Sequence, residues 1–310
     1  MKKIILLITI ASLSFSDGKI SGVSYFGYED NFTLSRVYFT YKKSISDDLS
    51  FKFQTDVGRI DNSELASEEE VDNDNRWMAF LKKAHIDWKV ADKTKISMGM
   101  IGMNMLNVQE KTWGYRFLRK SALDLYKFSA TADIGMSISK DLGFLYTNLT
   151  MTNGEGYKES VVDDNSKISL QLVHGERRLD KKDGYNVGLA YSTVKDDSDV
   201  ETTVTGLFGG WAGNNMRIGA ELNTQNVGEI SNQATSIYFN YNINDDFSAF
   251  IRQDARDLNI DLDGDDDSAM MLGLIWSPTK GLSICPNMTQ NTDASDVSED
   301  SFAIDFQFKF

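Results

Sequence analysis

The two histidines of the chain limit the reactions that the sequence could catalyse. A hydrolase of the serine type needs a histidine beside a serine or a carboxylate. His174 shares an apolar alternation phase with Leu172, whereas His85 shares a polar phase with Lys83 and Asp87. Neither pattern indicates an activated nucleophile, so the sequence predicts that the chain is not an enzyme. A hydrolase remains the weakest of the alternatives.

Candidate metal and thiol residues are also sparse. The segment Asn259–Gly264 has the spacing of oxygen ligands that begins a calcium loop, but Met270 stands where such a loop needs a bidentate glutamate. Cys285 is the only cysteine, which excludes a disulfide framework and a cysteine-rich zinc site. The sequence therefore predicts no cofactor and no specific metal site, and the acidic segment should hold divalent ions only loosely.

Charged residues are distributed unevenly along the chain. The net charge is −14, which argues against nucleic acid as a partner because phosphates need a basic surface. More than half of the 46 acidic residues lie in five connections. These connections are Arg59–Asn75, Asn153–Asn165, Asp196–Asp199, Asp257–Asp267 and Gln290–Asp300.

The connection Met103–Tyr126 has the opposite character. It holds more basic than acidic residues, although it is longer than any of the acidic connections. Its charged residues are Lys111, Arg116, Arg119 and Lys120 against Glu110 and Asp124. These six residues are the candidates for a site that attracts anions.

The segments between the connections have the alternation of β-strands. Sixteen segments of about ten residues can be counted, from 19–28 to Ser301–Phe310, in which apolar residues alternate with polar or small ones. They include 127–139 and 282–289, of which the second is the least regular because Pro286 cannot donate to a strand ladder. Alternation alone fits a soluble sandwich as well as a barrel.

The connections favour the barrel. Short connections such as Lys140-Asp141 are rich in residues that tight hairpins need, and they tend to alternate with the longer acidic ones. Short inner turns opposite longer outer loops are typical of an outer-membrane barrel. The sequence therefore predicts an all-β chain that forms a closed antiparallel transmembrane β-barrel of about sixteen strands.

The polar phase of these strands should line the water-filled interior. Basic and acidic residues are almost equal in number in this phase, so we expect a wall that is nearly balanced in charge. The phase contains Arg36, Lys52, Asp56, Lys83, His85, Asp87, Lys127, Asp133, Arg217, Glu221, Arg252, Asp254, Arg256, Asp305 and Lys309.

The N-terminus has the order of a secretory signal. Lys2 and Lys3 precede an apolar run that is too short to span a bilayer, and small residues follow at Ser14 and Ser16. The sequence predicts a signal peptide over residues 1–16, which is removed, and a single barrel domain over residues 17–310.

Two further stretches carry a family resemblance. The chain ends on Phe306, Phe308 and Phe310 in alternation, which resembles the C-terminal signal that the barrel-assembly machinery of bacteria recognises. The stretch Trp113–Phe117, which leads into Ser129–Gly135, resembles the third-loop region of bacterial porins and of their phosphate-selective relatives. With the signal peptide and the sixteen segments, the whole mature chain resembles the bacterial porin superfamily.

This resemblance implies a location in the bacterial outer membrane, contact with its lipid and a homotrimer. It also implies that Met103–Tyr126 folds into the lumen as the pore constriction, where its basic residues would attract solutes of negative charge. The expected function is a passive channel for small hydrophilic solutes and ions, mildly preferring anions such as phosphate.

Two alternatives to this function remain. The loop charges could solvate an ordinary outer loop, and the barrel could be an adhesin or receptor whose loops bind a partner. Sixteen strands argue against the adhesin, because so wide a barrel must hold water or a plug.

Overall fold

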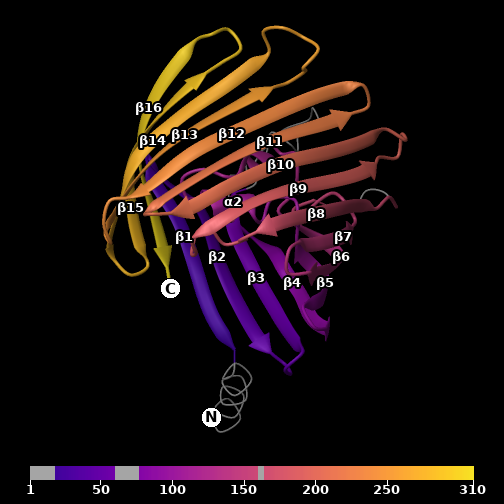
Figure 1. Ribbon diagram of the computed structural model, residues 1–310. Coiled ribbons are helices and arrows are strands. Elements are labelled where there is room, and N and C mark those ends of the chain that lie inside the picture. The colour runs from indigo at the N-terminus through magenta and orange to yellow at the C-terminus, as the bar shows by residue number, and fades with distance from the viewer. Residues whose placement is uncertain (1–17, 60–76, 160–163) are drawn as a thin grey trace.

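The computed structural model describes residues 18–59, 77–159 and 164–310. The predicted signal peptide and most of the acidic connection Arg59–Asn75 lie outside the described residues. In the described part, sixteen antiparallel strands each pair with their neighbours in sequence, and β1 pairs with β16 to close the barrel (Figure 1). The predicted fold and strand number are therefore confirmed.

The strands match the predicted segments within a few residues at most ends. Tight turns of Asp, Asn, Gly or Lys join many of them at one end of the barrel, as in the Asn214-Asn215 turn, where both residues have positive φ. The strands are β1 (Lys19–Tyr28), β2 (Phe32–Ser44), β3 (Leu49–Arg59), β4 (Trp77–Ala91), β5 (Thr94–Gly102), β6 (Ala132–Asp141), β7 (Tyr146–Thr152), β8 (Lys167–Gly175), β9 (Gly184–Lys195), β10 (Glu201–Gly213), β11 (Met216–Val227), β12 (Ile230–Asn242), β13 (Phe247–Asp257), β14 (Asp266–Thr279), β15 (Leu282–Thr292) and β16 (Ser298–Lys309).

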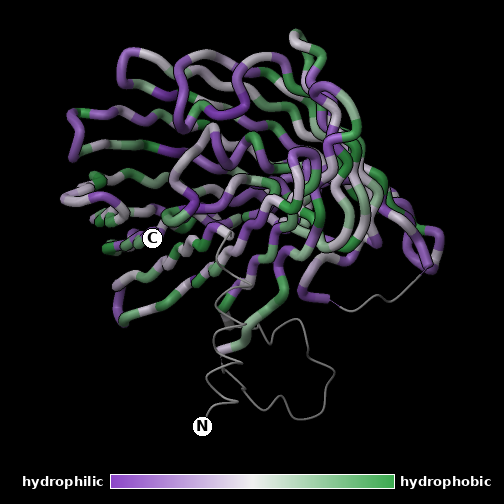
Figure 2. Tube along the Cα trace, turned by 90° about the horizontal axis from the view of Figure 1, so that it is seen from below, coloured by the Kyte–Doolittle hydropathy of each residue, from purple (hydrophilic) through white to green (hydrophobic). Residues whose placement is uncertain are grey.

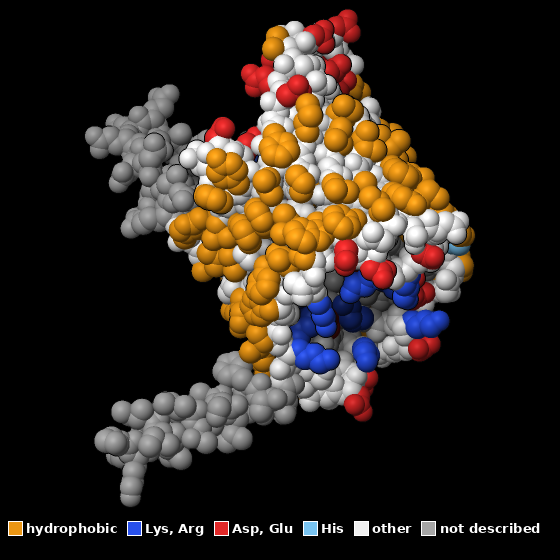
Figure 3. Space-filling view, turned by 90° about the vertical axis from the view of Figure 1, so that its left-hand side faces the viewer, with side chains coloured by type: hydrophobic (Ala, Val, Ile, Leu, Met, Phe, Trp, Pro, Cys, Tyr) orange, Lys and Arg blue, Asp and Glu red, His pale blue; other side chains and the backbone are white. Residues whose placement is uncertain are grey.

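Burial in the barrel is inverted relative to a soluble protein. On β11, Ile218 and Leu222 are each 42% exposed, whereas Glu221 and Asn223 are buried. Hydrophilic and hydrophobic residues alternate along the strands (Figure 2). Hydrophobic side chains form a broad band on the outer face (Figure 3). An apolar outer band around a polar interior is the surface that a bilayer requires. Among the described residues, no helix is long and apolar enough to cross a membrane.

The C-terminal strand takes part in this outer band. Phe302, Phe308 and Phe310 are exposed, and Phe306 stacks on Phe26 of β1 with a ring distance of 4.7 Å. The backbone of Phe310 exchanges two hydrogen bonds with Gly22 of β1. The last residue thus contributes directly to closing the barrel.

Two strands differ from the prediction for identifiable reasons. β6 begins at Ala132 rather than at residue 127, because the loop before it stays folded inside the barrel. β15 continues through Pro286 to Thr292, and its ladder with β14 is interrupted around the proline, between the pairs Gly273–Asn287 and Trp276–Ile284. An irregular ladder at this position tolerates the missing N–H group.

Candidate functional site

The connection between β5 and β6 runs through the inside of the barrel. It carries two short helices, α2 (Gln109–Trp113) and α3 (Ala122–Leu125), which contact β10, β11 and β12. Apolar side chains of this third loop, such as Leu106 and Leu123, pack with Val204 of β10 in one buried cluster. The predicted folding of the third loop into the lumen is confirmed.

Trp113 is the main anchor of the third loop. Its buried ring lies 4.8 Å from the guanidinium of Arg252 on β13. Its carbonyl oxygen accepts hydrogen bonds from Arg217 (2.9 Å) and Asn240 (3.1 Å). Gly114 ends α2 with a φ of 82°, and any larger side chain there would collide with Arg217. Glycine therefore permits the contact between the loop and the wall.

A buried ion network also attaches the loop to β13. The guanidinium of Arg119 lies 2.6 Å from the carboxylate of Asp254. Two nitrogens of the Arg252 guanidinium donate hydrogen bonds to the same carboxylate. The side chains of Arg252 and Asp254 are 0% and 1% exposed. Arg119, one of the residues predicted at the constriction, thus pairs with a carboxylate of the barrel wall.

The opposite half of the lumen is open. A cavity of about 470 Å³ lies between the third loop and the inner faces of β1 to β7. Among the described residues, eight basic ones line it against two acidic ones, Asp87 and Glu110. Lys and Arg side chains gather in a hollow at one end of the barrel (Figure 3). The basic residues of this inner cavity are Lys42, Lys52, Lys82, Lys83, Lys95, Lys111, Arg116 and Arg177.

A second, outer cavity of about 260 Å³ adjoins the inner one. Lys82, Arg116 and Thr131 line both cavities, so they mark the place where the two meet. Arg116 contacts Glu110 at 3.2 Å and Asp124 at 2.7 Å. Burial opposes the charge of Arg116, but the neighbouring Glu110 and Asp124 raise its pKa well above the usual value. Arg116 is therefore a permanent cation at this junction.

Lys82 is a residue of the junction that alternation did not predict. The ladder between β3 and β4 pairs Gln54 with Lys83 but Thr55 with Leu81, so Lys82 is an inserted residue. Such a β-bulge changes the side-chain alternation locally. As a result, Lys82 and Lys83 both line the inner cavity. In the sequence, only the presence of two adjacent lysines, Lys82 and Lys83, could have indicated that both face the lumen.

The ammonium group of Lys82 is held in a cage. It lies 3.5 Å from Asp56 Oδ2 and from the hydroxyls of Tyr38 and Tyr157. Asp56 is fully buried and also accepts hydrogen bonds from Arg36 (2.9 Å) and from Tyr157 (2.5 Å). Tyr157 belongs to the connection between β7 and β8, so a second loop contributes to the junction.

The remaining predicted lumen residues divide into three groups. Lys52, Lys83, His85 and Asp87 line the inner cavity, where His85 Nδ1 lies 3.0 Å from the carbonyl oxygen of Met100. The residues that line the outer cavity are Arg36, Lys120, Asp124 and Lys127, the last of which lies in the third loop rather than on a strand.

The third group lies against loops rather than beside either cavity. Asp133, Glu221 and Arg252 are buried, and Arg217 binds the carbonyl group of Trp113. Arg256 pairs with Asp267 near the outer rim. Of the predicted basic wall residues, only Lys52 and Lys83 line the inner cavity, and the other cations of that cavity are Lys42, Lys82, Lys95, Lys111, Arg116 and Arg177.

Lys111 projects from α2 into the inner cavity. Burial lowers its pKa to about 8, and the positive charge of Arg178 acts in the same direction. Its charge therefore responds to pH near neutrality, unlike that of Arg116.

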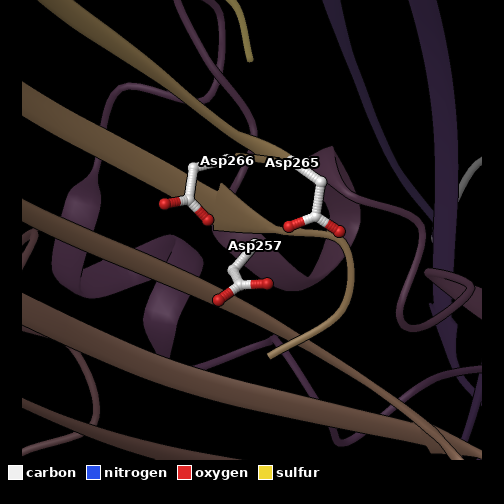
Figure 4. Close-up of side chains that lie close together, drawn as sticks. All are labelled: Asp257, Asp265 and Asp266. Atoms are coloured by element: carbon white, nitrogen blue, oxygen red, sulfur yellow. The ribbon is translucent and has the colours of Figure 1, made fainter. Parts of the chain in front are cut away.

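The acidic segment before β14 brings three carboxylates together. Oxygen atoms of Asp257, Asp265 and Asp266 lie within 4.8 Å of one another (Figure 4). The calcium-like spacing noted in the sequence covers Asn259–Gly264, but the three aspartates of this cluster lie just before and just after that segment. Exposed acidic groups of this kind are common on outer loops, and the cluster defines no specific site.

Solved structures with the same architecture are porins and other outer-membrane proteins. OmpT of Vibrio cholerae in a trimer form is 12% identical, with a TM-score of 0.63 over 94% of this chain and 99% of that one. An anion-selective porin from Comamonas acidovorans is 9% identical (TM-score 0.64, 94% and 99%). Salmonella typhi OmpF in complex with daunomycin is 13% identical (TM-score 0.63, 94% and 97%). The sequence matches no protein-family model and no curated protein.

These likenesses are of fold and not of sequence. The closed barrel of sixteen strands, its apolar outer band and its inward third loop define the chain as a porin-like β-barrel of the bacterial outer membrane.

Proposed function

We propose that the chain is a passive, water-filled channel for small hydrophilic solutes, with a mild preference for anions such as phosphate. The observation that supports this proposal is the lining of the inner cavity, where eight basic residues face two acidic ones. The third loop supplies Lys111 and Arg116, and β2 to β5 supply most of the others. Cations on both sides of the inner cavity favour anions there.

The shape of the lumen strengthens the effect of these charges. The third loop and its apolar anchors fill the side of the barrel next to β10 to β13. A low-dielectric wall close to the path focuses the field of the cations on the solute. A solute therefore passes closer to the charges at the junction than to those of the acidic outer loops. Salt also screens the charges of the outer loops more strongly.

Several features of assembly belong to the same proposal. Residues 1–16 direct secretion and are removed, and Phe306, Phe308 and Phe310 form the signal for the barrel-assembly machinery. The barrel works as a homotrimer in contact with outer-membrane lipid, as the trimer form of OmpT supports.

Planar-bilayer recordings test the proposal directly. We expect discrete conductance steps and, in a KCl gradient, a reversal potential that corresponds to a chloride permeability above that of potassium. Phosphate on one side should carry current as well. An adhesin or receptor barrel would give no regular steps, and a cation-preferring reversal potential would contradict the role given to the inner cavity.

A further inference from the structure

One periplasmic connection is unusually long. The turn between β8 and β9, Glu176–Asp183, has eight residues, whereas other turns at this end, such as Asp92-Lys93 and Lys280-Gly281, have two. Outer-membrane barrels normally keep their periplasmic turns short. The β8–β9 turn therefore needs an explanation beyond connecting two strands.

The turn folds into the barrel and lies next to the third loop. Leu179 is 3% exposed, and its Cδ1 lies 3.2 Å from the position of a Cβ on Gly210 of β10. Thr112 of α2 lies against the same glycine. Asn186 donates hydrogen bonds both to the carbonyl oxygen of Glu176 (2.9 Å) and to Thr112 Oγ1 (3.0 Å). The turn thus lies directly under α2 on the periplasmic side.

Internal bonds fix the shape of the turn. The guanidinium of Arg178 donates two hydrogen bonds of 2.8 Å to the carboxylate of Asp180. The backbone N–H of Arg178 donates a hydrogen bond to the carboxylate of Glu176. The N–H groups of Lys181 and Lys182 both donate to the carbonyl oxygen of Arg178. A turn with this many internal bonds is a fixed part of the lumen wall rather than a loose flap.

The turn also borders the way out of the inner cavity. Arg177 lines this cavity, where its guanidinium lies 3.8 Å from the ring of Tyr146. Leu179–Asp183 line a separate recess of about 410 Å³ beside β10 to β12. Asp180 and Lys181 interact electrostatically with Lys309, which belongs to β16 on the opposite side of the barrel. The turn therefore reaches into the periplasmic mouth from one wall.

We propose that Glu176–Asp183 is a second constriction, which sets the size limit for solutes that pass between the inner cavity and the periplasm. The inference rests on the proposed channel function, because a size limit has meaning only in a conducting pore. The charges of the turn are largely paired, as in Arg178 with Asp180, Lys182 with Glu176 and Arg177 with Asp141. The turn restricts size more than it selects charge.

The test uses the full-length protein in planar bilayers, with neutral polyethylene glycols of graded size added to one side. In the test variant, Asn-Gly replaces Arg177–Gly184, which keeps the backbone bond between Glu176 and Tyr185. We expect the polymer cut-off to shift to larger sizes from the periplasmic side and to stay unchanged from the outer side. The control variant shortens the exposed outer turn Ala294–Val297, and its periplasmic cut-off should equal that of the unmodified chain.

A second measurement covers the case in which the shortened turn impairs assembly. Lys181→Cys and the control Lys93→Cys, at the tip of the β4–β5 turn, keep the chain at full length, and native Cys285 is buried. A bulky thiol reagent added on the periplasmic side should reduce the conductance of Lys181→Cys and leave Lys93→Cys unchanged.

The outcomes separate the two proposals. A periplasmic cut-off that the shortened turn leaves unchanged, or no block of Lys181→Cys, would overturn the second constriction while the pore still conducts. An unmodified chain without any current would overturn the channel function and the constriction together.

Discussion

Removing cations from the inner cavity tests the source of anion preference quantitatively. Lys52, Lys83 and Lys111 line the cavity, and none of them forms an ion pair with a described residue. A sphere of 470 Å³ has a radius of about 5 Å, and we take about 5 Å as the working distance between a passing anion and each ammonium group. Substituting all three by glutamine removes three attractions of this length and keeps the side-chain size similar.

The expected magnitude follows from Coulomb's law. In water, each pair at about 5 Å contributes about 0.8 kcal/mol, which screening at 0.1 M salt reduces to about 0.5 kcal/mol. Three cations together contribute about 1.5 kcal/mol, equivalent to about a tenfold change in permeability ratio. At 1 M salt the Debye length is about 3 Å, so the same substitution should change the ratio only about twofold.

The assay is the reversal potential of single channels in a KCl gradient at low and high salt. The matched control carries the same change at Lys93, Lys140 and Lys195, which are exposed and line neither cavity. If the exposed triple variant lowers the chloride preference as much as the cavity variant, net charge determines selectivity and the reasoning about the cavity is wrong. An effect that does not shrink at high salt would also contradict it.

Three further predictions address pH, stability and assembly. Because Lys111 is charged only below its pKa of about 8, chloride preference should fall as the pH rises from about 6 to about 9. Lys111→Arg should make that decline in the reversal potential smaller, and a decline of unchanged size would assign it to other groups. Asp254→Asn leaves Arg119 and Arg252 without their buried counter-charge and should destabilise the barrel by about 3 to 5 kcal/mol in urea unfolding, whereas Asp246→Asn on an exposed turn should have little effect. Deleting Phe310 removes two backbone hydrogen bonds to Gly22 and should lower the yield in the outer membrane without affecting secretion, and equal membrane yields would refute this role.

The sequence was sufficient for the architecture because a membrane barrel repeats one simple pattern. Alternation and turn residues are local, and they predicted sixteen strands and the inward phase of most of them. Local patterns were insufficient where the chain departs from regular pairing. Lys82 faces the lumen only because β4 has an inserted residue opposite Gln54 and Thr55, and no property of Lys82 itself indicates this.

Tertiary contacts decided the roles of the loop residues. The third loop was recognised from its basic composition and from resemblance, but its charges do not act alike. Arg116 lies at the junction of the two cavities, whereas Arg119, three residues later, pairs with Asp254 on the wall. The sequence placed Lys127 on a strand, because the alternating pattern begins five residues before β6 does. In the structure, Lys127 still belongs to the third loop. The position of a partner such as Asp254 follows only from the folded barrel.

The attachment of the third loop to one side makes the channel eccentric. An ion in the inner cavity meets the wall from β1 to β7, whereas the third loop covers much of the inner face of β10 to β13. Substitutions in these two parts of the wall should therefore have different consequences. Inner residues of the first part can be exchanged to retune which solutes pass, whereas those of the second can change only together with the loop that covers them.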